Sequence, residues 1–164
     1  MIKFGGENKE INEKCKGAPF LLSLEDNPDN VLRVVIAFPM EGGEGERLED
    51  FPEKLREKAD DMLIHSKPVY EDMDQVYEII FEDYIIYQNR NESYTCWDDY
   101  EIRKGNYLII FDRSRLLDYY GNVVLGFDYD ETKNESRMHY GIYTENHILD
   151  VISNSKPVIR KVQR

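Results

Sequence analysis

The feature that most constrains the fold is a succession of short segments in which apolar and polar residues alternate, separated by turn-forming residues. Two pairs of such segments are residues 19–25 with 31–38 and residues 100–103 with 106–111. The sequence DNPDN separates the first pair and Lys104-Gly105 separates the second. Alternation with period two is typical of half-buried strands, and turn residues of this kind connect the strands of hairpins. The pattern therefore predicts two β-hairpins.

A third hairpin is predicted from residues 138–144 and 147–153. If Thr144 pairs with His147, the apolar side chains of both strands come to lie on one face, and this is the register we expect. These apolar residues are Met138, Tyr140, Ile142, Leu149 and Val151.

Residues 76–81 and 84–89 also alternate, with Glu82-Asp83 between them. A two-residue turn here would place Phe81 opposite Tyr84 in a fourth hairpin. Glu-Asp is a poor hairpin turn, and a single bent strand is the alternative. Further strands are expected at residues 123–127 and, as an edge strand after Pro157, at residues 158–162.

Two helices are expected. Residues 50–65 carry apolar residues at helical spacing, with Asp50 and Glu53 as a capping box and Pro68 after the end. A shorter helix is predicted at residues 113–120, where Asp112 or Ser114 supplies the N-cap. The expected fold class is α+β, with a curved or partly closed antiparallel sheet built from hairpins and the helices on one side. Residues 1–164 are expected to form a single domain.

The net charge of −12 repels phosphate backbones, so nucleic acid is not an expected partner. Apolar runs are far shorter than the roughly 20 residues that cross a bilayer, and the first residues lack the pattern of a secretory signal. A cytoplasmic location is therefore expected, with no membrane association. The two cysteines, Cys15 and Cys96, are expected to be free thiols, and Cys96 to be buried. No metal or cofactor is expected.

The sequence lacks the phosphate-binding, nucleophile-elbow and zinc-protease motifs, each of which would indicate a specific mechanism of binding or catalysis. One pair of residues remains as a candidate for acid/base catalysis. In the register predicted for residues 138–153, His139 and Asp150 lie diagonally on one face, where a carboxylate orients an imidazole. The alternative is a structural hydrogen bond within the hairpin.

All twelve tyrosines fall between Tyr70 and Tyr143, and the single tryptophan is among them. Aromatic side chains with a polar tip are favoured at recognition surfaces, although tyrosine also fits half-buried strands. In one segment the aromatic residues alternate with acids, and this segment is the candidate partner-binding surface. Its residues are Glu92, Tyr94, Trp97, Asp98, Asp99, Tyr100 and Glu101.

These features favour a small acidic bacterial protein without catalytic activity that binds a basic partner protein, as a toxin-neutralising immunity protein does. Residues 77–84 and 139–147 are also typical of small bacterial proteins. The alternative is a small enzyme or small-molecule-binding module that uses His139 and Asp150. A third hypothesis is a homo-oligomer formed through the edge strand at residues 158–162.

Overall fold

The computed structural model describes residues 2–8, 17–42, 52–53, 56, 69–96, 98–123 and 137–162. The described residues form nine strands, an α-helix and a short 3₁₀ helix. These elements are β1 Phe20–Asp26, β2 Leu32–Glu41, β3 Val69–Phe81, β4 Tyr84–Asn91, η3 Glu92–Tyr94, β5 Ile102–Lys104, β6 Leu108–Arg113, α3 Arg115–Val123, β7 Met138–Tyr143, β8 His147–Ser153 and β9 Val158–Lys161.

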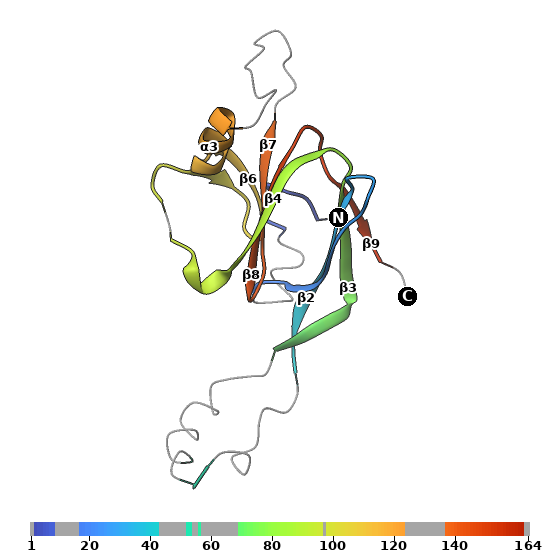
Figure 1. Ribbon diagram of the computed structural model, residues 1–164. Helices are drawn as coiled ribbons and strands as arrows, with labels where there is room; N and C mark the ends of the chain where they lie inside the picture. The colour runs from blue at the N-terminus through green and yellow to red at the C-terminus, as the bar shows by residue number, and fades with distance from the viewer. Residues whose placement is uncertain are drawn as a thin grey trace.

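The strands form two antiparallel sheets (Figure 1). One has four strands in the order β1-β2-β3-β9, and the other has five in the order β4-β8-β7-β6-β5. The prediction of antiparallel structure built from hairpins is therefore confirmed. The single curved or partly closed sheet is wrong, because the strands divide between two sheets and neither closes on itself. The predicted helix at 50–65 lies outside the described residues, apart from a few isolated positions.

The division into two sheets occurs at Glu82-Asp83, where the chain leaves β3 and enters β4. The expected pairing of Phe81 with Tyr84 is wrong: Phe81 pairs with Leu32, and Tyr84 pairs with Ser153. The chain crosses back between β8 and β9, and Ser153 Oγ donates a hydrogen bond to the Asp83 carbonyl oxygen at 2.8 Å. β3 and β4 do not form a hairpin for two reasons. Glu-Asp does not favour the positive φ of a tight hairpin turn, and β2 and β9 already pair with both edges of β3.

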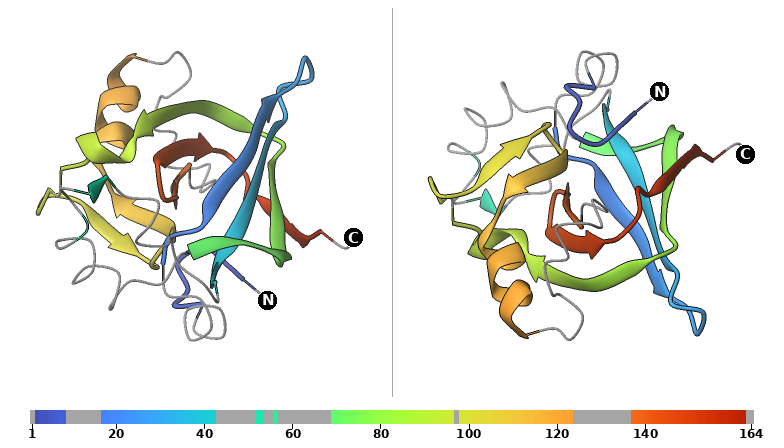
Figure 2. Two further views of the ribbon diagram at one scale, coloured as in Figure 1. Left: turned by 90° about the horizontal axis from the view of Figure 1, so that it is seen from below. Right: turned by 90° about the horizontal axis from the view of Figure 1, so that it is seen from above.

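The main hydrophobic core lies between the two sheets. Buried apolar side chains from β2 and β3 pack against those from β6, β7 and β8. Phe81 contacts Tyr140 edge to face across the interface, with ring centroids 5.6 Å apart, and Phe4 completes the aromatic cluster at 4.9 Å from Tyr140. Figure 2 shows the two layers from both ends, with α3 on the side of the five-stranded sheet away from β2 and β3. The second face of the five-stranded sheet is thereby covered in part by α3.

The hairpins predicted from local turn signals are confirmed. β1 pairs with β2 around residues 27–31, where Asn30 adopts a φ of +57°, and β5 pairs with β6. Gly105 between β5 and β6 has a φ of +98°, and a Cβ atom there would lie 2.4 Å from the Leu108 carbonyl oxygen. Only glycine fits that position.

The predicted register of the β7/β8 hairpin is also confirmed. Thr144 and His147 close the turn, with the Thr144 amide donating to the His147 carbonyl oxygen at 2.8 Å, and Gly141 lies opposite Asp150. The expected apolar face belongs to the core between the sheets, with Met138 partly buried at its edge. His147, at the strand end, is exposed.

The short helix lies close to its predicted position, but α3 begins at Arg115 and continues to Val123 rather than ending near residue 120. The strand expected from Val123 is therefore wrong at that residue, and residues 124–127 lie outside the described part. β9 is an edge strand of the four-stranded sheet, as predicted, and its pairing with a second copy stays a prediction. Among the described residues, no helix is long and apolar enough to cross a membrane.

Candidate functional site

A pocket of about 250 Å³ lies between α3 and the face of the five-stranded sheet that points away from the core. Residues of β4, β6, β7 and β8 form its floor, and residues of α3 form one wall. The residues that line it are Gln88, Arg90, Glu101, Phe111, Arg115, Leu116, Tyr119, His139 and Asp150.

Strand register places the polar side chains of the floor in a row across adjacent strands. Gln88 on β4 lies opposite Asp150 on β8, and His139 on β7 is diagonal to Asp150. The Asp150 carboxylate is 3.1 Å from His139 Nε2 and accepts a hydrogen bond from Gln88 Nε2 at 3.0 Å. Arg90 Nη1 lies 3.5 Å from the same carboxylate. The sequence prediction that His139 and Asp150 meet is therefore confirmed by geometry.

The second ring nitrogen of His139 is occupied as well. His139 Nδ1 lies 2.8 Å from Ser114 Oγ, and Ser114 Oγ accepts a hydrogen bond from the Leu117 amide at 3.1 Å. A neutral imidazole satisfies this chain when the Ser114 hydroxyl donates to Nδ1 and the protonated Nε2 donates to Asp150. The network therefore links the first turn of α3 to the sheet beneath it.

The side chains of this network are buried and closely packed. His139 and Asp150 are each 2% exposed, Ser114 is 0% exposed, and Phe111 stacks on the imidazole with ring centroids 4.0 Å apart. Burial by itself raises the pKa of Asp150, but the hydrogen bond and charge of His139, the hydrogen bond from Gln88 and the charge of Arg90 outweigh it. The pKa of Asp150 therefore lies below its ordinary value, and the carboxylate stays charged inside the protein.

Serine, histidine and aspartate in contact are the residue types of a nucleophilic triad. Here Ser114 does not line the pocket, and its hydroxyl is buried as the N-cap of α3. Both imidazole nitrogens already have partners. A ligand in the pocket therefore meets no free nucleophile or imidazole nitrogen in this network.

The predicted partner-binding segment borders the same pocket, and part of it is held by internal contacts. Asp98 forms an ion pair with Arg115 on α3, and this hydrogen bond is the main reason that the pKa of Asp98 is lowered. The Tyr100 ring lies beneath the Arg113 and Arg115 guanidinium groups, 4.4 and 4.6 Å from their central carbons. Its hydroxyl donates to Asp118 at 2.6 Å. Asp98 and Tyr100 therefore attach the segment to α3.

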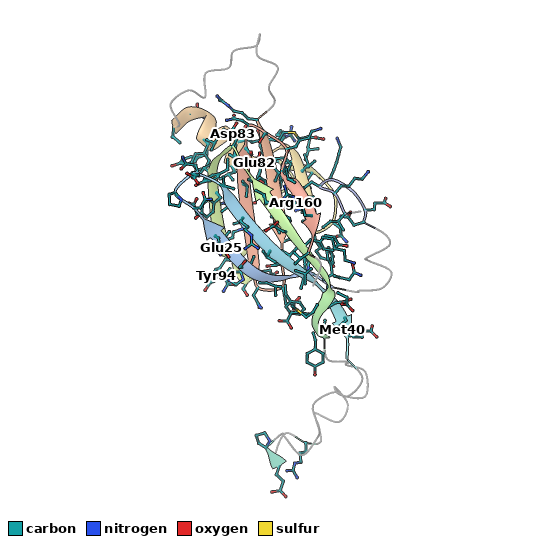
Figure 3. All side chains as sticks on the ribbon, turned by 90° about the vertical axis from the view of Figure 1, so that its right-hand side faces the viewer. Glu25, Met40, Glu82, Asp83, Tyr94 and Arg160 are labelled. Atoms are coloured by element: carbon teal, nitrogen blue, oxygen red, sulfur yellow. The ribbon has the colours of Figure 1, made fainter. Side chains whose placement is uncertain are left out.

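The remaining predicted residues have different surroundings. Glu101 lines the pocket, whereas Glu92 and Asp99 are exposed. Tyr94, at the end of η3, is 85% exposed (Figure 3). Trp97 lies outside the described residues, as do Cys15 and His65. Cys96 is a free thiol but is exposed, so its expected burial is wrong.

Sequence reasoning missed the arginines and the glutamine of the pocket. Gln88 and Arg90 follow the alternation of β4, which predicts that they share a face, but no local signal indicates that β4 pairs with β8. Arg115 has no signal in the sequence, because a basic residue in the first turn of a helix belongs to no motif. Ser114 caps the helix, as one of the two predicted alternatives. Its contact with His139 has no signal in the sequence.

No group of three His, Cys, Asp or Glu residues in the described part of the chain is arranged to hold a metal ion. The chain matches no model of a protein family, and no curated protein or solved structure shows significant similarity to it.

Proposed function

We propose that this chain is a non-catalytic binding protein that recognises a basic partner protein, as an inhibitor that neutralises a toxin does. The observation that carries the proposal is the surface formed by residues 92–96 and 98–101. It presents exposed carboxylates and an exposed tyrosine, and Asp98 and Tyr100 hold it against α3. A surface that is already ordered loses less conformational entropy on binding.

Electrostatics supports a basic partner. The net charge of −12 accelerates the encounter with a cationic protein. Asp98 is already neutralised by Arg115, so Glu92, Asp99 and Glu101 are the carboxylates of this surface available to a partner. Tyr94 supplies the aromatic contact area that dominates many interfaces.

The test compares two double variants with the same change in net charge. Glu92→Lys with Asp99→Lys alters the proposed surface, and Glu71→Lys with Asp74→Lys alters exposed acids on β3. Wild type and both variants capture proteins from an extract of the source organism, and the association rate constant is then measured for each captured basic protein. The first variant is expected to slow association at least about tenfold relative to the control.

Three outcomes would contradict the proposal or place binding on another surface. Equal association rates for the wild type and the Glu92/Asp99 variant would remove this surface from the function. Slower association with the Glu71/Asp74 variant alone would move binding to the start of β3, near the exposed Met40 (Figure 3). Absence of any specifically captured protein would contradict the binding of a partner protein.

A second candidate function is favoured by one observation, the pocket that touches both His139 and Asp150. This function is the binding of a small molecule on the five-stranded sheet. In this role His139 and Asp150 are positioning residues, because their polar atoms bond to one another, Ser114 and Gln88. Titration calorimetry with small-molecule panels tests this function independently of protein capture.

A further inference from the structure

We propose that the pocket beside α3 binds a small zwitterion of the α-amino-acid type, an inference that rests on the second candidate function above. Three properties of the pocket carry it: its volume, its lining by charged groups of both signs, and the spare hydrogen-bonding capacity of these charged residues.

The volume limits the ligand to a small molecule. Pockets for drug-sized ligands occupy about 300–1,000 Å³. The pocket of about 250 Å³ falls below this range, and a single free amino acid is of suitable size. A nucleotide or an oligosaccharide would extend out of a pocket of this size.

Charged groups of both signs line the pocket. Arg90 and Arg115 carry positive charge, and Glu101 and Asp150 carry negative charge. Asp98, beside the pocket, pairs with Arg115. A zwitterion presents a carboxylate to an arginine and an ammonium group to a carboxylate, and it brings no net charge to the site.

The two arginines have donors to spare for a carboxylate. Arg90 Nη1 is a long 3.5 Å from Asp150, so the outer nitrogens of Arg90 retain donors for an acceptor in the pocket. Arg115 uses Nε for Asp98, which leaves its outer nitrogens for another acceptor. Arginine is suited to binding carboxylates through paired donors, and an under-satisfied guanidinium gains most from a new acceptor.

Glu101 is the acceptor for the ammonium group. Its side chain forms no hydrogen bond or ion pair with another described residue, although it lines the pocket. Asp150 is unsuitable, because its carboxylate is 2% exposed and already has His139, Gln88 and Arg90 as partners. The cation-binding and anion-binding groups are therefore different residues.

Apolar groups complete the lining. Leu116 and Tyr119 project from α3, and Phe111 lies on β6 beside the imidazole of His139. These side chains offer apolar and aromatic surface to the ligand's own side chain. An amino acid with an apolar or aromatic side chain is therefore expected to bind more tightly than glycine.

The experiment is a titration of the full chain with each common L-amino acid, at concentrations up to about 10 mM, using calorimetry. At least one amino acid is expected to bind with a Kd of about 1 mM or tighter. Its amide, which lacks the carboxylate, and its N-acetyl derivative, which lacks the ammonium group, are each expected to bind at least about tenfold more weakly.

Variants assign the two ends of the ligand. Arg115→Gln and Arg90→Gln are expected to weaken the amino acid and its N-acetyl derivative alike. Glu101→Gln should weaken the amino acid but leave the N-acetyl derivative unchanged. Arg160→Gln, on β9 in the other sheet, is the matched control and should change nothing (Figure 3). Because Arg115 is largely exposed on α3, its variant is informative even if loss of Arg90 disturbs the fold.

The outcomes separate this inference from the function on which it rests. Binding of another class of small molecule, lost in Arg115→Gln, would overturn the zwitterion and leave the pocket function standing. Failure of every amino acid and every other small molecule would overturn both. Amino-acid binding that is insensitive to Arg90, Arg115 and Glu101 would place the ligand elsewhere and overturn the inference.

Discussion

At the scale of single residues, Asp150 shows how a carboxylate is kept charged within a protein. Burial alone would favour its neutral form, yet His139, Gln88 and Arg90 lower its pKa. The same contacts hold Gln88 and Arg90 in place on the floor of the pocket. Loss of the charge would therefore disturb both the stability of the fold and the shape of the site.

Asp150→Asn is expected to lower the free energy of unfolding by about 1–3 kcal/mol at neutral pH. The amide replaces one acceptor oxygen with a donor that faces Gln88 or Arg90, and it leaves the arginine without its counter-charge. Urea unfolding measures the change. Asp99→Asn, at an exposed position, is the control and should change stability by less than about 0.5 kcal/mol.

The effect of Asp150→Asn should depend on pH. The folded-state pKa of Asp150 is lowered, so the unfolded chain takes up the proton first as the pH falls. The stabilisation is complete above the ordinary aspartate pKa of about 3.9 and is lost as the pH falls towards the folded-state value. The stability difference between wild type and variant should therefore shrink as the pH falls below about 4. A difference that stays unchanged from about pH 4 to about pH 2 would contradict this account.

At the scale of elements, Ser114 joins α3 to the sheet. Its hydroxyl caps the helix through the Leu117 amide and contacts His139 beneath it. A helix as short as α3 depends on such contacts, because isolated helices of this length are unstable in water. The position of α3 in turn determines where Arg115, Leu116 and Tyr119 meet the pocket.

Ser114→Ala is expected to destabilise the protein by about 1–2 kcal/mol and to accelerate hydrogen exchange at the Leu117 amide. The physical reason is the loss of the N-cap together with the buried contact to His139. Exchange measured by NMR checks the local effect, with Ser93→Ala at an exposed position of η3 as the control. Unchanged protection of the Leu117 amide would show that the cap does not hold the first turn.

At the scale of the whole molecule, the two sheets share one core. Phe81 is fully buried and contacts Phe4 and Tyr140, which lie in different parts of the chain. Strands β3 and β4 follow one another directly, as do β8 and β9 after a short connection, so the two sheets are joined covalently at two places. This arrangement favours the single domain expected from the sequence.

Phe81→Ala is expected to lower the free energy of unfolding by about 3–5 kcal/mol and to destabilise both sheets together. Hydrogen exchange with mass spectrometry along a urea titration should give the same midpoint for peptides from β1–β3 and from β6–β8. Two separate midpoints would contradict the single domain. Phe81→Leu, which keeps most of the buried volume, should cost clearly less.

The amino-acid sequence predicts correctly those parts of the fold in which interacting residues are close along the chain. Turn residues and alternation predicted the β1/β2, β5/β6 and β7/β8 hairpins, and the β7/β8 register brought His139 to Asp150. A slip of one residue between β7 and β8 would have turned Tyr140 and Leu149 away from the core. The burial of these apolar side chains is therefore enough to select the register.

The crossing of the chain between the sheets at Glu82-Asp83 and the pairing of β4 with β8 depend on contacts between distant parts of the chain. Gln88 and Asp150 are 62 residues apart, and local propensity carries no information about such a pairing. It depends on which strand edges remain free and on how two apolar faces pack together, properties that exist only when the whole chain is folded. For this reason the sequence predicted the pair of residues at the centre of the pocket but not the arginines around it.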